Sequence, residues 1–197
     1  MKLPLTLAAI VLSCAIAFPA SAQFGKVERS QAEIALEQAE TRQAKQKAAR
    51  EAAEAACAAQ NMEGCFKLAD MQRTGSGGAQ DLKAAAKSYK IMCDARDGRG
   101  CAGLAYLTVK GRGVTENQAE GRALYKKACD YGDVSGCAAY GNMAFTGLGG
   151  RKDTVAGTQA LTSACDRDYE WACTRMRDLG VYDTDDNAFD RLKDIRG

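Results

Sequence analysis

The residues of this sequence whose type and spacing bear most directly on chemistry are its nine cysteines. Eight of them fall into four pairs, whose members lie eight positions apart, and successive pairs begin 36 residues apart. The pairs are Cys57 and Cys65, Cys93 and Cys101, Cys129 and Cys137, and Cys165 and Cys173. Zinc sites usually space their cysteines by about two to four residues and often add histidine, and this chain has no histidine. The pattern therefore predicts disulfides and no metal site.

Two disulfide schemes are compatible with this spacing. Residues eight apart in one helix are separated by about 12 Å, whereas a disulfide needs α-carbons roughly 4.4–6.8 Å apart, so the chain must reverse direction within each pair. One scheme joins the two cysteines of each pair and uses all eight. The other joins 65–93, 101–129 and 137–165, and leaves Cys57 and Cys173 unpaired. Without Cys14 the chain has eight cysteines, and an even count in a secreted chain favours the first scheme.

Residue patterns for catalysis are not found in the sequence. A serine β-lactamase typically carries Ser-x-x-Lys with Ser-Asp-Asn and Lys-Thr-Gly, and none of these motifs occurs here. A metal-dependent hydrolase usually builds its site with histidine, which is also the side chain whose unperturbed pKa is near neutrality. We therefore predict no catalytic residues and no cofactor, and the residues give no support for an enzyme.

The first 22 residues are predicted to be a secretory signal peptide. Lys2 supplies a positive start, residues 3–18 are an apolar run, and Ala20-Ser21-Ala22 is a cleavage site of the A-x-A type. The apolar run is shorter than the roughly 20 residues of a membrane-spanning helix, so we expect no transmembrane segment after signal removal. Disulfides persist in the bacterial periplasm and outside the cell, and we expect a secreted protein of the periplasm.

A fixed period of 36 residues predicts a repeat architecture, and the elements that position the cysteines are helices. The predicted first helices of the repeats cover residues 61–74, 97–110, 133–146 and 169–179, and the second helices cover 81–94, 117–130 and 153–166. In each of the first three repeats, the first helix is followed by a pair of glycines, which permit the positive φ at which helices end. Residues 23–46 form a predicted N-terminal helical extension or cap, residues 47–183 the repeats, and residues 184–197 a C-terminal cap.

Three short motifs carry a family resemblance: Gly111-Arg-Gly113-Val114, Tyr125-Lys-Lys-Ala-Cys129, and Gly132-Asp133 followed by Gly136-Cys137. With them, residues 47–183 resemble the Sel-one-like repeat, a relative of the tetratricopeptide repeat, and within it the cysteine-rich Hcp family of secreted bacterial proteins. The resemblance implies an all-α fold, an α/α-solenoid of about four 36-residue helix-pair repeats that are each stapled by a disulfide. The chain departs from the family where Gln72, Thr108 and Ala144 replace an expected aromatic residue.

The resemblance also implies a function. Members act mainly as scaffolds for protein–protein or peptide binding, which here would be a secreted or periplasmic scaffold. The alternative that the family implies is an Hcp-type penicillin-binding protein or weak β-lactamase, with a peptidoglycan-related or β-lactam ligand. The 27 basic and 25 acidic residues are nearly balanced and form no basic stripe with aromatic residues, so nucleic-acid binding is not predicted.

The predicted binding surface is the concave face of the solenoid. Solenoids bind partners on their concave face, and we expect the first helices of the repeats to line it. Residues that differ between equivalent positions of the repeats are not fixed by packing. The partner-binding residues predicted in this way are Lys67, Asp70, Tyr106, Asn142 and Arg175.

Overall fold

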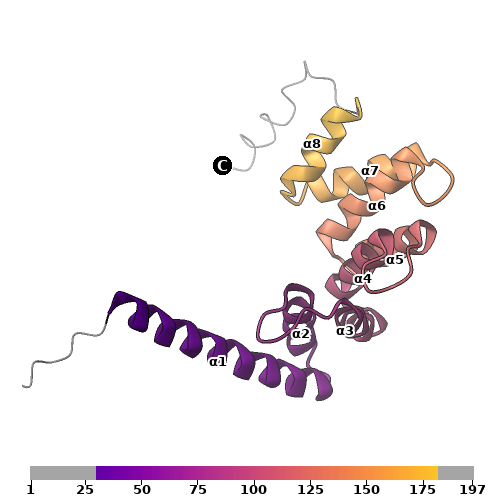
Figure 1. Ribbon diagram of the computed structural model, residues 1–197. Coiled ribbons are helices and arrows are strands. Elements are labelled where there is room, and N and C mark those ends of the chain that lie inside the picture. Colours follow the sequence, from indigo (N-terminus) through magenta and orange to yellow (C-terminus); the bar gives the residue numbers. More distant parts are fainter. Residues whose placement is uncertain (1–29, 182–197) are drawn as a thin grey trace, which may run out of the picture.

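The computed structural model describes residues 30–181, and every regular element in that range is an α-helix (Figure 1). The predicted signal peptide and the predicted C-terminal cap lie outside the described residues. The helices are α1 (Gln31–Ala58), α2 (Met62–Thr74), α3 (Leu82–Asp94), α4 (Gly98–Lys110), α5 (Gln118–Asp130), α6 (Val134–Thr146), α7 (Thr154–Cys165) and α8 (Glu170–Asp178). From α2 onward their bounds agree with the predicted bounds to within one residue.

The helices stack into an arc, in which each helix packs mainly against its neighbours in sequence. Helices α2, α4, α6 and α8 line the inner side of the arc, and α3, α5 and α7 form its outer side (Figure 1). The predicted all-α solenoid of 36-residue helix pairs is confirmed. No helix of residues 30–181 is long and apolar enough to cross a membrane.

Capping residues set where each helix begins and ends. Asp97 and Asp133 accept backbone N–H bonds at the starts of α4 and α6, and Asp81 does the same for α3, which satisfies amide groups that the helix itself leaves free. At the other ends, Gly75, Gly111 and Gly147 take the left-handed conformation and close α2, α4 and α6. The first glycine of each predicted pair is therefore a helix stop, as the sequence indicates.

The second glycine of each pair has a different role, which is contact between repeats. Gly113 has a φ of +77°, and a β-carbon on it would meet the backbone of Leu82 at the start of α3. The loop after α4 thus crosses directly over the preceding outer helix. The equivalent close approaches are Gly77 against Gln46 and Gly149 against Gln118. Only glycine fits where two backbones approach this closely.

Four disulfides join Cys57 to Cys65, Cys93 to Cys101, Cys129 to Cys137 and Cys165 to Cys173. Their α-carbons are 4.3–4.9 Å apart. Each bond ties the end of α1, α3, α5 or α7 to the start of the next helix. The adjacent scheme, which uses all eight cysteines, is the one that the structure contains.

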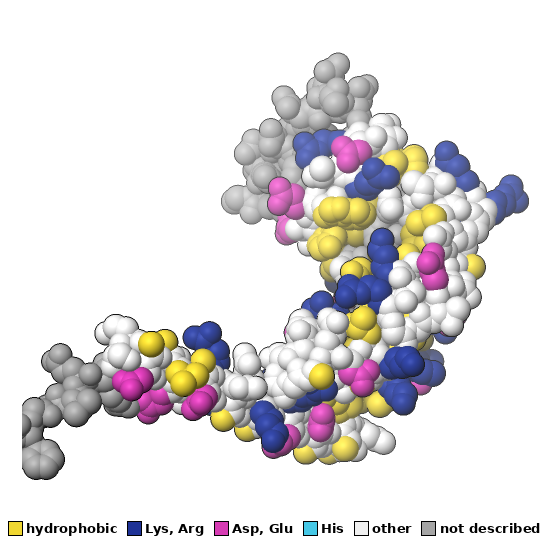
Figure 2. Space-filling model, in the orientation of Figure 1, with side chains coloured by type: hydrophobic (Ala, Val, Ile, Leu, Met, Phe, Trp, Pro, Cys, Tyr) yellow, Lys and Arg dark blue, Asp and Glu magenta, His cyan; other side chains and the backbone are white. Residues whose placement is uncertain are grey.

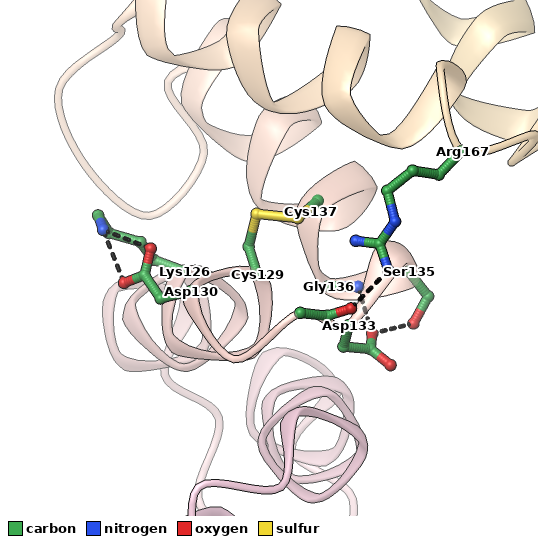
Figure 3. Close-up of a disulfide and its surroundings, with 9 residues drawn as sticks. Lys126, Cys129, Asp130, Asp133, Ser135, Gly136, Cys137 and Arg167 are labelled. Carbon is green, nitrogen blue, oxygen red and sulfur yellow. Dashed lines mark hydrogen bonds and ion pairs between the residues drawn. A yellow bond between two sulfur atoms is a disulfide. The ribbon is translucent and has the colours of Figure 1, made fainter.

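The turn beside the third disulfide shows how polar groups support the bond (Figure 3). Asp133 Oδ1 accepts hydrogen bonds from the Gly136 N–H and the Ser135 hydroxyl, both at 2.6 Å. Arg167, from the following turn, donates to the carbonyl oxygen of Gly132 at 2.8 Å. Neighbouring turns are therefore connected by hydrogen bonds as well as by helix packing.

One position in each of these turns has a positive φ. It is occupied by Gln60, Arg96, Gly132 and Asp168, with φ values of 61°, 61°, 87° and 61°. A residue with a side chain is less stable by about 1–2 kcal/mol in this conformation. Only Gly132 adopts this conformation without that cost. Gln60, Arg96 and Asp168 each lie in a turn that a disulfide closes.

The inner helices bury large apolar side chains against their neighbours. Leu68, Met71, Leu107, Met143 and Met176 are buried. All three departures from the family pattern are buried as well, and the polar atoms of Gln72 and Thr108 are hydrogen-bonded. Ser88 donates to Gln72 Oε1 at 2.9 Å, and Thr108 donates to the carbonyl oxygen of Leu104 at 2.9 Å. The core therefore tolerates these polar residues without an unpaired group.

Helix α1 differs from the other helices because only its C-terminal part packs on the repeats. Ala53 and Cys57 are buried, and this part occupies the place of an outer helix before α2. The side chains of residues 31–48 are almost all exposed, and this part projects away from the arc (Figure 1). Residues 30–46 belong to the predicted N-terminal extension, whose role as a cap stays a prediction.

Candidate functional site

The inner side of the arc is hollowed and carries hydrophobic side chains interspersed with Lys and Arg (Figure 2). The hollow has a volume of 830 Å³ and extends from α2 to α8. Six aromatic side chains line it, and α4 and α6 contribute small residues between them. The aromatic residues are Phe66, Tyr89, Tyr106, Tyr125, Tyr169 and Trp171, and the small ones are Ala102, Gly103, Ala138 and Ala139.

Close packing of Tyr89 requires one of these small residues. A β-carbon on Gly103 would lie 2.6 Å from the Tyr89 ring, so only glycine lets that ring, which is 5% exposed, pack against α4. Because this part of α4 carries no large side chain, the hollow reaches close to the helix backbone. The hollow thus depends on the contact between Tyr89 of α3 and Gly103 of α4.

The two arginines that line the hollow are paired with carboxylates beside it. Arg99 forms ion pairs with Asp97 at 2.9 Å and Glu63 at 2.8 Å, and its guanidinium lies 4.7 Å from the centre of the Phe66 ring. Hydrogen bonding from Arg99 lowers the pKa of Asp97. Arg73 is paired in the same way with Asp70. Arginine stacked on an aromatic ring is held in a defined orientation, so Arg99 forms a fixed part of the wall of the hollow.

Burial raises the pKa of Tyr125 to about 12, and Tyr106, Tyr169 and Asp133 add to the shift. We expect a difference titration of tyrosinate absorbance, native protein minus Tyr125→Phe, to have its midpoint near pH 12. The unfolded chain should ionise near pH 10. Because the pKa of Tyr125 is higher in the folded protein, its protonated hydroxyl contributes to the free energy of unfolding. This contribution is complete below pH 10 and is lost as the pH rises towards 12. A midpoint near 10 in the native protein would contradict the burial of Tyr125.

The five predicted partner-binding residues lie in three places. Tyr106 lines the inner hollow, and its hydroxyl accepts a hydrogen bond from Arg112 at 3.4 Å. Lys67 and Asp70 line a second hollow of 530 Å³ between α1 and α2. Arg175 donates to Asn142 Oδ1 at 2.7 Å, which links α8 to α6. The two hollows meet at Phe66, which lines both. The partner-binding role of all five stays a prediction.

Sequence reasoning alone does not single out Arg99 or Tyr169, and it gives Tyr89 and Tyr125 no role in binding. The position of Arg99 does carry a usable signal. It is occupied by Glu63, Arg99, Ser135 and Trp171 in the four copies, so it differs in every repeat. Three of these four residues line the inner hollow. A position that varies this much in both size and charge faces the open side of the arc.

Metal binding has no candidate among the described residues. The acidic side chains Glu63, Asp70 and Asp97 are each paired with an arginine, and eight cysteines are in disulfides. Within residues 30–181, no three histidine, cysteine or acidic side chains gather where they could hold a metal ion.

Stacked 36-residue helix pairs, each joined to the next by a disulfide, define a Sel-one-like, cysteine-rich helical repeat fold, and comparisons with known structures confirm it. The chain is similar to a Sel1 repeat protein from Oxalobacter formigenes, with a TM-score of 0.58 and 22% identity over 64% of this chain and 95% of that one. It is also similar to cysteine-rich protein B of Helicobacter pylori, with a TM-score of 0.55 and 24% identity over 67% and 95% of the two chains.

A third similar structure is a protective antigen of uropathogenic Escherichia coli that displays an SLR fold. Its TM-score is 0.60 at 22% identity, and the match covers 63% of this chain but only 27% of the antigen. No family model and no curated protein matches the sequence. By its fold, the chain is a helical repeat protein of the Sel-one-like kind.

Proposed function

We propose that this protein is a secreted or periplasmic scaffold that binds a peptide or protein segment on the inner side of its arc. The observation that carries the proposal is the 830 Å³ hollow with its six aromatic side chains. Tyrosine, tryptophan and arginine are the residues that most often dominate binding energy at protein interfaces. Trp171 and Tyr106 are 47% and 39% exposed, which leaves their rings free for a partner.

The size and position of the hollow favour a segment of chain as the ligand. Its lining includes residues of α2, α4, α6 and α8, so a bound segment would contact several repeats at once. Binding then depends on how the repeats stack, because their relative rotation sets the distances between the aromatic rings.

The proposed location rests on the cysteines and on the first 22 residues. Four disulfides in a chain of 197 residues indicate an oxidising compartment. The predicted signal peptide would direct the chain there. Detection of a chain that begins at Gln23 in a periplasmic fraction would support this location.

We expect the double substitution Tyr106→Ala with Trp171→Ala to weaken binding of a protein partner by about 10- to 100-fold. The partner would be identified by affinity capture from a periplasmic extract and then purified, and its Kd measured by calorimetry. Tyr131→Ala is the matched control, because Tyr131 is 37% exposed but does not line the hollow. Neither variant should lower the melting temperature by more than a few degrees.

One result would overturn the inner-face proposal. If the double variant binds the partner normally and deletion of residues 31–46 abolishes binding, the exposed part of α1 is the recognition element. That deletion leaves the buried Ala53 and Cys57 in place and removes only the contact of Gln46 with Gly77 from the first repeat.

A further inference from the structure

The part of α1 that projects from the arc, residues 31–48, is a helix with almost all of its side chains exposed. The buried residues of α1 are Ala53 and Cys57, which lie beyond this part. The face of the projecting part that is visible in Figure 2 carries both acidic and basic side chains. A helix of this length is only marginally stable in water by itself, and most helices in proteins are stabilised by packing one face against a neighbour.

The charges of the projecting part are segregated along the helix. Three acidic residues in its first half are followed by three basic residues in its second half, namely Glu33, Glu37 and Glu40, then Arg42, Lys45 and Lys47. Residues three or four apart are neighbours on a helix surface, and like charges at that spacing destabilise the helix. Between residues 31 and 47 the charged pairs at this spacing are 33–37, 37–40 and 42–45, and all three are pairs of like charge. The neighbouring charges of this helix therefore repel one another.

An antiparallel second copy of the same helix would place opposite charges together. If two copies are aligned antiparallel and centred on Thr41, residues equally far before and after Thr41 lie level with each other. Glu37 then lies level with the second copy's Lys45, and Glu40 with the second copy's Arg42. A parallel copy would instead bring the two acidic halves together and the two basic halves together. Charge pairing between helices sets their choice of partner and their orientation.

The face available for this contact carries small and uncharged residues. Ile34, Thr41 and Ala48 are spaced seven apart, which places them on one face of α1. Thr41 donates its hydroxyl to the carbonyl oxygen of Glu37 at 2.8 Å, so its polar group is satisfied within the helix. The buried Ala53 is turned from Ala48 by about 140° around the helix axis. The contact face therefore points away from the side of α1 that packs on the repeats.

We propose that the projecting part of α1 pairs with the same part of a second copy of this chain, in an antiparallel dimer with two-fold symmetry. Both copies then use the same surface, as in most homodimers. The interface is small, so the dissociation constant is in the micromolar range, and its charge pairs make it sensitive to salt. The inner hollow is lined by residues from Phe66 onward, so this proposal does not depend on the proposed function.

Sedimentation equilibrium of the oxidised protein tests the dimer. We expect a monomer–dimer equilibrium, with a Kd that rises by about tenfold between about 50 and 500 mM salt. Glu37→Lys with Glu40→Lys, and Arg42→Glu with Lys45→Glu, should each weaken association by at least about tenfold. An equimolar mixture of the two variants should associate again, because one projecting helix is then mostly basic and the other mostly acidic. That recovery would also show that both variants are folded.

Two further measurements test the location and the orientation of the contact. Lys83→Glu with Lys87→Glu is the matched control, since it makes the same change of charge at exposed positions of α3, and it should dimerise like the native protein. With a short bis-maleimide reagent, Thr41→Cys should cross-link to its counterpart in the second copy. Gln31→Cys should not, because its two copies would lie about 30 Å apart in the antiparallel pair.

Three results would overturn the dimer proposal. The first is a monomer at every concentration, and the second is a dimer that both charge variants leave unchanged. The third is equal cross-linking of the two cysteine variants, which would indicate a parallel pair. None of them bears on the proposed function, because the Tyr106→Ala, Trp171→Ala test with a protein partner concerns the inner hollow and decides that proposal separately.

Discussion

Complete reduction of the four disulfides should leave the protein largely unfolded at 37 °C. A bond that closes a loop of eight residues stabilises the folded state by about 2–3 kcal/mol through the entropy of the unfolded chain. Four such bonds together contribute about 8–12 kcal/mol, which is comparable to the roughly 5–15 kcal/mol that a typical domain has in total. Circular dichroism melts of the oxidised and the fully reduced protein would measure the effect.

A single pair gives the quantitative test. Replacing Cys129 and Cys137 by alanine should lower the free energy of unfolding by about 2–3 kcal/mol, and the melting temperature by roughly 5–10 °C. The other three bonds serve as the internal control, and their integrity would be verified by peptide mapping. An unchanged melting temperature after full reduction would mean that helix packing alone is sufficient for stability.

Gly113→Ala, in the loop that joins α4 to α5, should strongly destabilise the protein. Alanine at a φ of +77° costs about 1–2 kcal/mol, and its β-carbon would meet the Leu82 backbone, which cannot move without shifting α3. Overpacking of this kind adds about 1–3 kcal/mol. The total of about 2–5 kcal/mol corresponds to a loss of roughly 5–20 °C in melting temperature.

Gly132→Ala provides the matched control. Gly132 has a φ of +87°, but a β-carbon there would meet no atom within 4 Å. The equivalent positions already carry Gln60, Arg96 and Asp168, so we expect a loss of only about 1–2 kcal/mol. Thermal melts of the two variants separate the cost of the backbone conformation from the cost of contact between repeats. Equal melting temperatures would show that the contact at Leu82 contributes nothing.

The fold could be predicted almost completely because the determinants are local and repeated. The 36-residue period of the cysteines, the aspartates at helix starts and the glycines at helix ends each act over a few residues. The predicted helix bounds therefore agree with the structure. The role of Gly113 could not be predicted in the same way, since it depends on Leu82, a residue of the preceding helix 31 positions away.

The candidate site was less predictable because it depends on the rotation between repeats. Variation among the copies correctly places Tyr106 on the inner side, but the same criterion gives no way to separate it from Asn142 and Arg175, which bond to each other. Tyr125 has the opposite pattern. Its place on an outer helix suggests packing, yet its side chain reaches the hollow between two inner helices.

The position of the disulfides also determines how the chain would respond to mechanical force. Each bond bypasses a turn of eight residues, and so removes roughly 25 Å from the contour length of a stretched chain. The segments left free to extend between the bonds run from 65 to 93, from 101 to 129 and from 137 to 165. Pulled from its ends, the oxidised protein would lengthen in three equal increments of one helix pair each, whereas the reduced chain would extend as a single continuous tether.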